Sequence, residues 1–346
     1  MPLREARYWT PEPDRIVRCT LCAQYCRIKP GKVGVCGVRE NVDGELRTSV
    51  YGMLAAMNVD PIEKKPLFHV LPGSRAFSLA TVGCNFRCTF CQNWDLSQSS
   101  KGRNRRISGQ QAEPDELVRA AVRSDCRVIA YTYSEPTIFY EWAYDIAKLA
   151  TVEGLLNVFV TNGYIAPEPL RDIQPHLNAA NVDLKSFHDA EYRKHMGAPG
   201  VKPVLDTLRL MRKLGIWVEV TTLVIPTRND SDDELRDIAR FIATELGPEV
   251  PWHISRFHPD YRDTALPPTP VSTLRRAYDI GCDEGLRYVY MGNVPGDNTE
   301  STRCHKCDAL LVHRFGFRVA ENRVTTEGAC PDCGTPVAGI GMGEHA

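Results

Sequence analysis

From Ser74 onward the chain alternates short apolar stretches with stretches of helical periodicity, and this alternation limits the possible folds more than any other feature. A repeated strand–helix unit implies parallel strands joined by right-handed crossovers. Both a doubly wound sheet and a full or partial barrel obey that rule. The expected strands are 77–82, 128–132, 156–160, 180–184, 216–224 and 252–257, with a helix expected after each.

Polar residues follow or end these apolar stretches. Chemistry in parallel α/β folds collects at the carboxyl ends of the strands. A barrel would gather the polar residues around one mouth, whereas a flat sheet would spread them apart. We therefore predict an α/β fold with a partial (β/α)6 TIM-like barrel. The residues in question are Cys84, Ser134, Glu135, Thr161, Asn162, Asp183, Lys185, Thr221, Thr222, His253, Ser255 and His258.

The strand–helix pattern covers only the middle of the 346 residues. A chain of this length exceeds one small core and suits a main domain with appendages. We expect a Cys-rich segment at 1–72, a core barrel at 73–298 and a zinc-ribbon-like domain at 299–346. The stretch 97–109 carries Lys101 and three arginines, and we expect it to form a solvated loop.

The net charge of −1 gives no strong nucleic-acid signal. No stretch reaches the roughly 18 apolar residues of a membrane helix, and residues 1–10 do not resemble a signal peptide. We therefore expect a cytoplasmic protein without a membrane partner. In such a reducing compartment, the 13 cysteines are better explained as metal ligands than as disulfides.

Three cysteines, Cys84, Cys88 and Cys91, have CxxxCxxC spacing directly after the first expected strand. Three thiolates can hold three irons of a cubane cluster and leave the fourth iron open to a small molecule. The alternative is a structural zinc site, which would need a fourth ligand.

Two further cysteine groups flank the barrel. Four thiolates on two CxxC turns predict a closed zinc site in the C-terminal domain, with a rubredoxin-like iron as the alternative. The N-terminal group favours either zinc or a second iron–sulfur cluster, and its spacing does not decide between them. The C-terminal group is Cys304, Cys307, Cys330 and Cys333, and the N-terminal group is Cys19, Cys22, Cys26 and Cys36.

The CxxxCxxC motif, with Phe90 just before its third cysteine, resembles that of the radical S-adenosylmethionine enzymes. The resemblance implies that the three cysteines hold a 4Fe–4S cluster whose open iron binds S-adenosylmethionine. One electron would then release a 5′-deoxyadenosyl radical, which abstracts hydrogen from the substrate. A reductant such as flavodoxin or ferredoxin is implied as a partner.

The same resemblance implies cofactor-binding residues elsewhere. Tyr133-Ser134-Glu135-Pro136 corresponds to a Gly-Gly-Glu-Pro loop that touches the methionine amino group, although the two glycines are absent here. Thr161-Asn162-Gly163 and Asp183-Leu184-Lys185 resemble paired segments of the pyruvate formate-lyase activating enzymes. The cofactor-binding residues expected on this basis are Ser134, Glu135, Asn162, Asp183, Lys185 and His253.

Longer motifs are similar to those of the radical enzyme of the AmmeMemoRadiSam system, a family related to glycyl-radical activases. That resemblance implies Memo-type and AMMECR-type proteins as partners. The cysteine triad with its open iron, together with the polar residues at the strand ends, favours hydrogen abstraction from a protein or other large substrate. The alternatives are a glycyl-radical enzyme activase and a non-enzymatic zinc or iron–sulfur binding module. The motifs are the N-terminal cysteines, residues 60–67, 83–93, 131–137, 181–187 and 251–257, and the C-terminal CxxC pairs.

Overall fold

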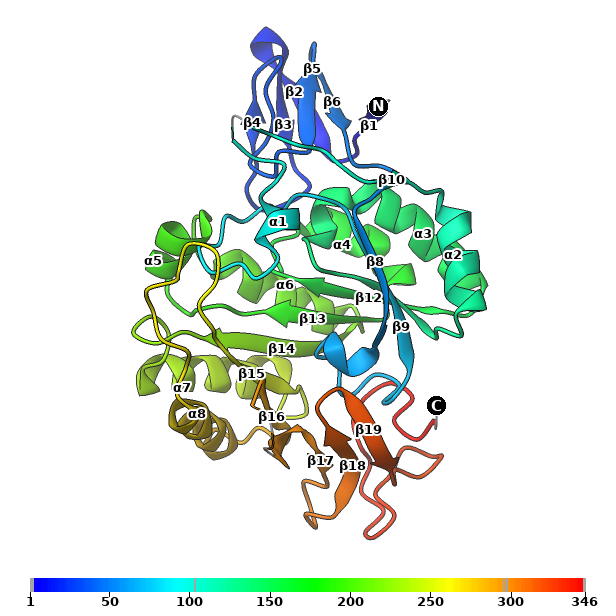
Figure 1. The fold of residues 1–346 in the computed structure, drawn as a ribbon, viewed down its shortest axis with the longest axis vertical. Coiled ribbons are helices and arrows are strands. Elements are labelled where there is room, and N and C mark those ends of the chain that lie inside the picture. Colours follow the sequence, from blue (N-terminus) through cyan, green and yellow to red (C-terminus); the bar gives the residue numbers. More distant parts are fainter. Residues whose placement is uncertain (1–2, 103, 295, 297, 345–346) are drawn as a thin grey trace.

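The computed structural model describes residues 3–102, 104–294, 296 and 298–344. The outer ends of the first and last expected domains lie outside the described residues. One eight-stranded sheet organises the fold (Figure 1). Its strands are β8 (Ala56–Pro61), β9 (Arg75–Ala80), β11 (Val128–Tyr131), β12 (Leu156–Thr161), β13 (Ala179–Asp183), β14 (Trp217–Val224), β15 (Trp252–Arg256) and β16 (Val289–Gly292).

The strands lie side by side in the order in which they occur in the chain. From β9 to β16 every neighbouring pair is parallel, and β8 adds an antiparallel strand beside β9. A doubly wound sheet would reverse its strand order at a switch point, and this sheet does not. The topology is therefore the sequential α/β arrangement that the repeated strand–helix unit predicts.

Helices connect the parallel strands, and their ends follow capping rules. The sequence Ser231-Asp232-Asp233-Glu234 predicts a capping box at the start of α7 (Asp232–Phe241), but only half of it forms. The Ser231 hydroxyl accepts a hydrogen bond from the Glu234 amide, whereas the Glu234 carboxylate accepts from Ser186 and Phe187. Helix α2 (Pro114–Arg123) begins with a proline at its first turn. The remaining crossover helices are α3 (Tyr140–Val152), α4 (Pro167–Ile173), α6 (Lys202–Lys213) and α8 (Val271–Asp283).

The N-terminal and C-terminal segments lie at opposite ends of the molecule, with the large sheet between them (Figure 1). The N-terminal segment forms two small three-stranded sheets. Its last strand, β8, belongs to the large sheet, so the expected boundary at residue 72 falls between two paired strands. The small sheets consist of β1 (Arg4–Glu5), β5 (Arg39–Val42) and β6 (Glu45–Thr48), and of β2 (Trp9–Glu12), β3 (Ile16–Cys19) and β4 (Arg27–Ile28).

The C-terminal segment forms a small antiparallel sheet of β17 (Thr302–Arg303), β18 (Leu310–Phe315) and β19 (Arg318–Asn322). Arg314 fastens this sheet to the core: its guanidinium is 3.4 Å from the Glu63 carboxylate and donates to the Phe68 carbonyl at 2.7 Å. Both charged side chains are fully buried. No helix in the described part of the chain is long and apolar enough to cross a membrane.

Candidate active site at the carboxyl ends of the strands

A cavity of about 240 Å³ opens where β11 to β15 end. Its wall brings together most of the residues that the sequence singled out, because the carboxyl ends of parallel strands meet at one edge. They are Cys84, Cys88, Cys91, Ser134, Glu135, Asn162, Asp183 and Lys185.

The three cysteines lie on the loop that follows β9. The Cys84 thiol accepts a hydrogen bond from the Phe86 amide at 3.3 Å, and the Cys91 thiol lies 3.1 Å from the Ser97 hydroxyl. Burial raises the pKa of Cys84 well above its usual range and that of Cys88 to about 12. Deprotonation of these buried thiols is therefore unfavourable in the absence of a cation. A metal that binds here would offset this cost, since a coordinating thiol is deprotonated.

A second loop holds the cysteine loop in place. The Arg87 amide donates to the Met196 carbonyl at 2.7 Å, and the Thr89 amide donates to the His195 carbonyl at 2.9 Å. These backbone bonds fix the loop before any ligand binds. The cysteines therefore belong to a constrained segment, as a metal site requires.

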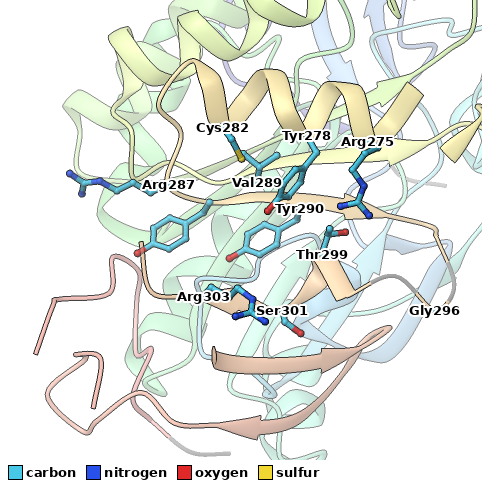
Figure 2. Close-up of a pocket in the computed structure, with 11 residues that line it drawn as sticks. Arg275, Tyr278, Cys282, Arg287, Val289, Tyr290, Gly296, Thr299, Ser301 and Arg303 are labelled. Carbon is cyan, nitrogen blue, oxygen red and sulfur yellow. The ribbon is translucent and has the colours of Figure 1, made fainter. Parts of the chain in front are cut away.

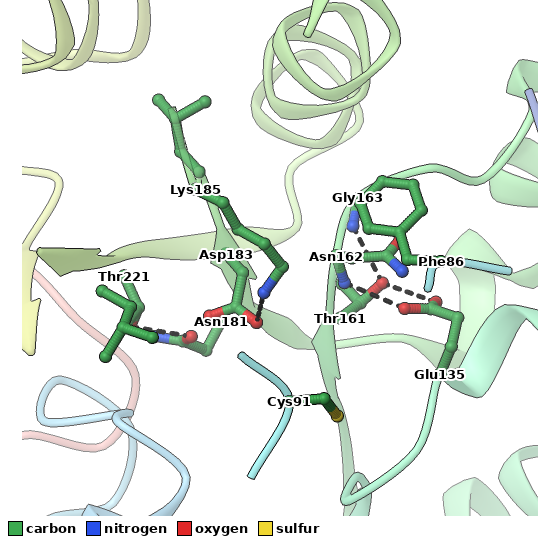
Figure 3. A network of polar contacts seen from close by, with 12 residues as sticks. Phe86, Cys91, Glu135, Thr161, Asn162, Gly163, Asn181, Asp183, Lys185 and Thr221 are labelled. Carbon is green, nitrogen blue, oxygen red and sulfur yellow. Dashed lines mark hydrogen bonds and ion pairs between the residues drawn. The ribbon is translucent and has the colours of Figure 1, made fainter. Parts of the chain in front are cut away.

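Glu135 is the centre of a buried polar network beside the cysteines (Figure 3). Its carboxylate accepts hydrogen bonds from the hydroxyls of Thr137 (2.6 Å) and Thr161 (2.7 Å) and from the amide of Asn162 (2.9 Å). Burial nevertheless leaves the pKa of Glu135 raised. Its carboxylate is thus engaged by the protein and joins the ends of β11 and β12.

Asp183 and Lys185 form an ion pair at the end of β13, with 2.7 Å between the Lys185 ammonium and a carboxylate oxygen (Figure 3). The lysine side chain is only 14% exposed. Burial acts to lower the pKa of Lys185, but Asp183 and Cys88 raise it above its usual value. The wall of the cavity therefore contains the Asp183–Lys185 ion pair as well as the three thiols.

Ser134 is buried, and its hydroxyl has no hydrogen-bond partner in the described part of the chain. A buried polar atom of this kind usually marks a missing water or ligand. The hydroxyl lines the same cavity as the three cysteines. It is the observation in this cavity that points most directly to a bound molecule.

His253, another expected cofactor ligand, does not line the cavity. Its ring Nε2 lies 2.6 Å from the Glu219 carboxylate, and Phe68 and Tyr290 pack against the ring. Burial acts to raise the pKa of Glu219, but its hydrogen bond with His253 holds the pKa below the usual value. The structure thus places His253 in a buried pair beneath the mouth of the fold.

Sequence reasoning missed two polar residues next to the cysteines. Asn85 follows Cys84 directly, and its side-chain oxygen accepts a hydrogen bond from Asn162 at 2.7 Å. Lys101 belongs to the stretch expected to be a solvated loop, yet it is half-buried and donates to the Gln98 side chain at 3.1 Å. Burial lowers the pKa of Lys101, while Cys84, Cys88 and Cys36 act in the opposite direction. Asn85 was recognisable from its position, but Lys101 was not.

The C-terminal cysteines form a compact four-sulfur group. All four sulfur atoms lie within 4.8 Å of one another, and two of the pairs are 3.6 and 3.7 Å apart. Zinc–sulfur bonds of about 2.3 Å in a tetrahedron place the sulfurs about 3.8 Å apart. The group can therefore hold one tetrahedral metal ion. Its members are Cys304, Cys307, Cys330 and Cys333.

A larger cavity of about 420 Å³ lies between α8, β16 and β17 (Figure 2). Arg275, Arg287 and Arg303 contribute to its wall. It shares no lining residue with the cavity of the three cysteines and contains none of the expected site residues. We do not assign it to the candidate active site.

The model of the Radical SAM superfamily matches residues 78–242. An uncharacterized protein of Methanocaldococcus jannaschii is 45% identical over 336 residues, which are 97% of this chain and 99% of that protein. The pyruvate formate-lyase-activating enzyme of Clostridium pasteurianum is 24% identical over 166 residues, 46% of this chain and 66% of that enzyme. The crystal structure of a radical SAM methyltransferase from Sphaerobacter thermophilus has a TM-score of 0.49 at 16% identity, covering 64% of this chain and 68% of that one.

Proposed function

The chain belongs to the radical SAM superfamily, and from this premise we propose that its cavity binds a 4Fe–4S cluster and S-adenosylmethionine. Enzymes of this superfamily cleave S-adenosylmethionine reductively, and the radical that forms takes a hydrogen atom from the substrate. The observation that carries the proposal is one cavity in which three thiols, the unpartnered Ser134 hydroxyl and the Lys185 ammonium converge. These donors fit both the 4Fe–4S cluster and S-adenosylmethionine.

The residues of the cavity have separate roles in this proposal. Cys84, Cys88 and Cys91 hold three irons and leave the fourth open. Lys185 offers a cation to the carboxylate of the bound amino acid, and Ser134 offers a hydroxyl. Glu135 and Asn162 act as positioning residues, because their hydrogen bonds within the protein orient the walls of the cavity.

We propose a protein or other large molecule as the substrate. Two observations support this class. One relative is the pyruvate formate-lyase-activating enzyme, whose name denotes action on another enzyme. The other is an aromatic pair near the cysteine loop: the 44% exposed Trp94 stacks on Tyr261 with ring centres 5.4 Å apart. Exposed aromatic side chains of this kind commonly anchor protein partners.

The same family membership supports further proposals on the fold, the C-terminal metal, the location and the partner proteins. We propose a curved partial barrel for the sheet, zinc in the C-terminal four-cysteine group and a reducing cytoplasm as the location. A flavodoxin or ferredoxin would supply electrons, and Memo-type and AMMECR-type proteins are the first partners to test.

The experiment for the substrate uses anaerobically reconstituted full-length enzyme, S-adenosylmethionine and each candidate partner protein carrying deuterium. We expect deuterium in 5′-deoxyadenosine and a mass change in one partner. A Cys88→Ala variant should give neither. Deuterium-free 5′-deoxyadenosine with every protein partner would contradict a protein substrate.

A glycyl-radical enzyme activase is the second candidate, favoured by the similarity to the pyruvate formate-lyase-activating enzyme. In that case, hydrogen would leave a glycine of the partner protein. Electron spin resonance of a co-purified partner after turnover decides the question. A glycyl-radical doublet supports the activase, and an unchanged partner backbone with a modified side chain rejects it.

A further inference from the structure

The four N-terminal cysteines line a single narrow cavity. Cys19, Cys22 and Cys36 are buried, and Cys26 is half-buried. The chain wraps tightly around this point: Gly37 has a φ of +76°, and a side chain there would come within 2.0 Å of the Ser100 carbonyl oxygen. Thiols brought together in this way from one short, tightly folded segment form a ligand set.

The spacing of these thiols differs from that of the C-terminal group. In the part of the chain that the structure describes, only the C-terminal cysteines have three or more ligand atoms within 4.8 Å of one another. A single zinc ion needs that compact spacing. The ligands of a cubane cluster bind four different irons, so their sulfurs stand farther apart. Among the described residues, neither the N-terminal group nor the set of Cys84, Cys88 and Cys91 meets that 4.8 Å limit.

Two buried donors lack partners at the N-terminal cavity. Arg39 is 1% exposed and lines the cavity, yet its Nε has no acceptor among the described residues. The same holds for the side-chain nitrogen of Asn85. A third donor, the Val35 amide, bonds the Cys26 sulfur at 3.4 Å. Such donors suit the sulfurs of an anionic cluster, whose reduction potential they also tune.

The N-terminal cavity adjoins the cysteine loop of the active site. Asn85, in its wall, follows Cys84 directly, and the Gln24 side chain donates to the Asn85 carbonyl at 2.9 Å. A side chain added at Gly83 would lie 3.3 Å from the Cys36 carbonyl oxygen. The loop that carries Cys84 therefore packs directly against the segment that carries Gln24 and Cys36.

We propose that Cys19, Cys22, Cys26 and Cys36 bind a second 4Fe–4S cluster, which passes electrons to the cluster at Cys84, Cys88 and Cys91. The relay role rests on the proposed function, whereas the presence of the cluster does not. A low-potential one-electron protein carrier reduces the second cluster, which then returns to its oxidised state as the first cluster gains the electron. No bond forms or breaks in this transfer. With four cysteine ligands the second cluster has no open iron for S-adenosylmethionine.

The first experiment removes the active-site thiols with a Cys84→Ala/Cys88→Ala/Cys91→Ala variant, reconstituted anaerobically as the full chain. We expect about four irons and about one zinc per chain. We also expect a reduced-state electron spin resonance signal that S-adenosylmethionine leaves unchanged. About two zincs and no iron would overturn the proposal in favour of a structural zinc site at the N-terminal cysteines. A metal-free N-terminal site would overturn it as well.

The second experiment tests the relay with Cys26→Ala, which alters the most exposed of the four ligands. The electron spin resonance signal of the active-site cluster, which S-adenosylmethionine alters, should persist in this variant. Formation of 5′-deoxyadenosine should fall about tenfold with a flavodoxin as reductant and much less with dithionite. Equal rates for variant and wild type with both reductants would overturn the relay role.

The two proposals can fail separately. If the wild-type protein forms no 5′-deoxyadenosine but the triple variant holds iron, the proposed function fails and the second cluster stands. If the wild type is active and the triple variant holds no iron, the second cluster fails and the proposed function stands.

Discussion

The side-chain nitrogen of Asn162 lies 2.7 Å from the side-chain oxygen of Asn85, the residue that follows Cys84. The same nitrogen is 3.8 Å from the Cys84 sulfur. The oxygen of Asn162 accepts the Tyr164 amide at 3.1 Å, so the amide group is fixed in orientation. Through this contact, the end of β12 holds the loop that carries the cysteines.

The Asn162→Asp variant tests this contact. A carboxylate cannot donate, so an acceptor would face Asn85 and a thiolate in a buried site. The loss of one buried hydrogen bond costs about 1–3 kcal/mol. We expect lower iron occupancy and at least a tenfold slower formation of 5′-deoxyadenosine, measured by iron analysis and chromatography.

Asn322→Asp is the matched control. Asn322 also donates and accepts backbone hydrogen bonds, at 2.8 and 3.1 Å, but in the C-terminal sheet. Its cleavage activity should equal that of the wild type. Equal activity of Asn162→Asp and Asn322→Asp would contradict a positioning role for Asn162.

Arg314 should contribute strongly to the docking of the C-terminal segment. Arg314→Met leaves the buried Glu63 carboxylate without its cation, and breaking a buried pair typically costs about 3–5 kcal/mol. Denaturant unfolding under anaerobic conditions measures the loss. Arg323→Met removes an exposed pair with Asp332, 3.0 Å apart, and should cost less than about 1 kcal/mol. Similar losses of unfolding free energy in both variants would contradict a stabilising role for the buried Arg314–Glu63 pair.

The protein should become less stable as the pH falls, because of His69. Its Nδ1 lies 2.6 Å from the Ala338 carbonyl and its Nε2 2.7 Å from the Tyr290 hydroxyl, so both nitrogens of the buried ring have partners. Burial lowers its pKa to about 4, although Glu219 acts to raise it; Arg314 and His253 act to lower it further. Above an unfolded pKa of about 6.5 this neutral ring carries no penalty, and between about 6.5 and 4 the unfolded chain binds a proton that the native protein does not.

The stabilisation is therefore lost as the pH falls, by about 2 kcal/mol between pH 7 and pH 5. The measurement is the free energy of unfolding at both pH values, for the wild type and for His69→Gln. The variant should lose about 2 kcal/mol less over this interval, because it has no imidazole to protonate. The same loss in both proteins would show that another group is responsible.

The C-terminal metal should be independent of the radical chemistry. Cys304→Ala removes one of four thiols that lie within 4.8 Å of one another. We expect the loss of about one zinc per chain and a lower unfolding midpoint, with 5′-deoxyadenosine formation retained. Metal analysis together with the cleavage assay checks both. A loss of cleavage with full active-site iron would link this site to the reaction.

The strands and the cysteine loop were predictable because their signals are local. Apolar stretches bounded by turns predicted six of the seven parallel strands, all but β16, and polar residues at their ends predicted the cavity of Cys84, Glu135 and Lys185. The antiparallel strand β8 was not predicted as part of this sheet. Its pairing with β9 joins two segments that the sequence pattern alone assigned to different domains.

The position of His253 depended on a contact between strands that the sequence does not show. Residues two apart in a strand share a face, so His253 faces the same side as Ser255. It lies roughly 7 Å farther from the mouth, however, where Glu219 of the neighbouring strand binds its ring. Only the register between β14 and β15 reveals that pairing.

The most direct test of the account is the cleavage of S-adenosylmethionine by the anaerobically reconstituted full chain with a low-potential reductant. With the cluster verified by iron analysis and electron spin resonance, we expect 5′-deoxyadenosine from the wild type and none from Cys88→Ala. A wild-type protein with a full cluster and no 5′-deoxyadenosine would contradict it.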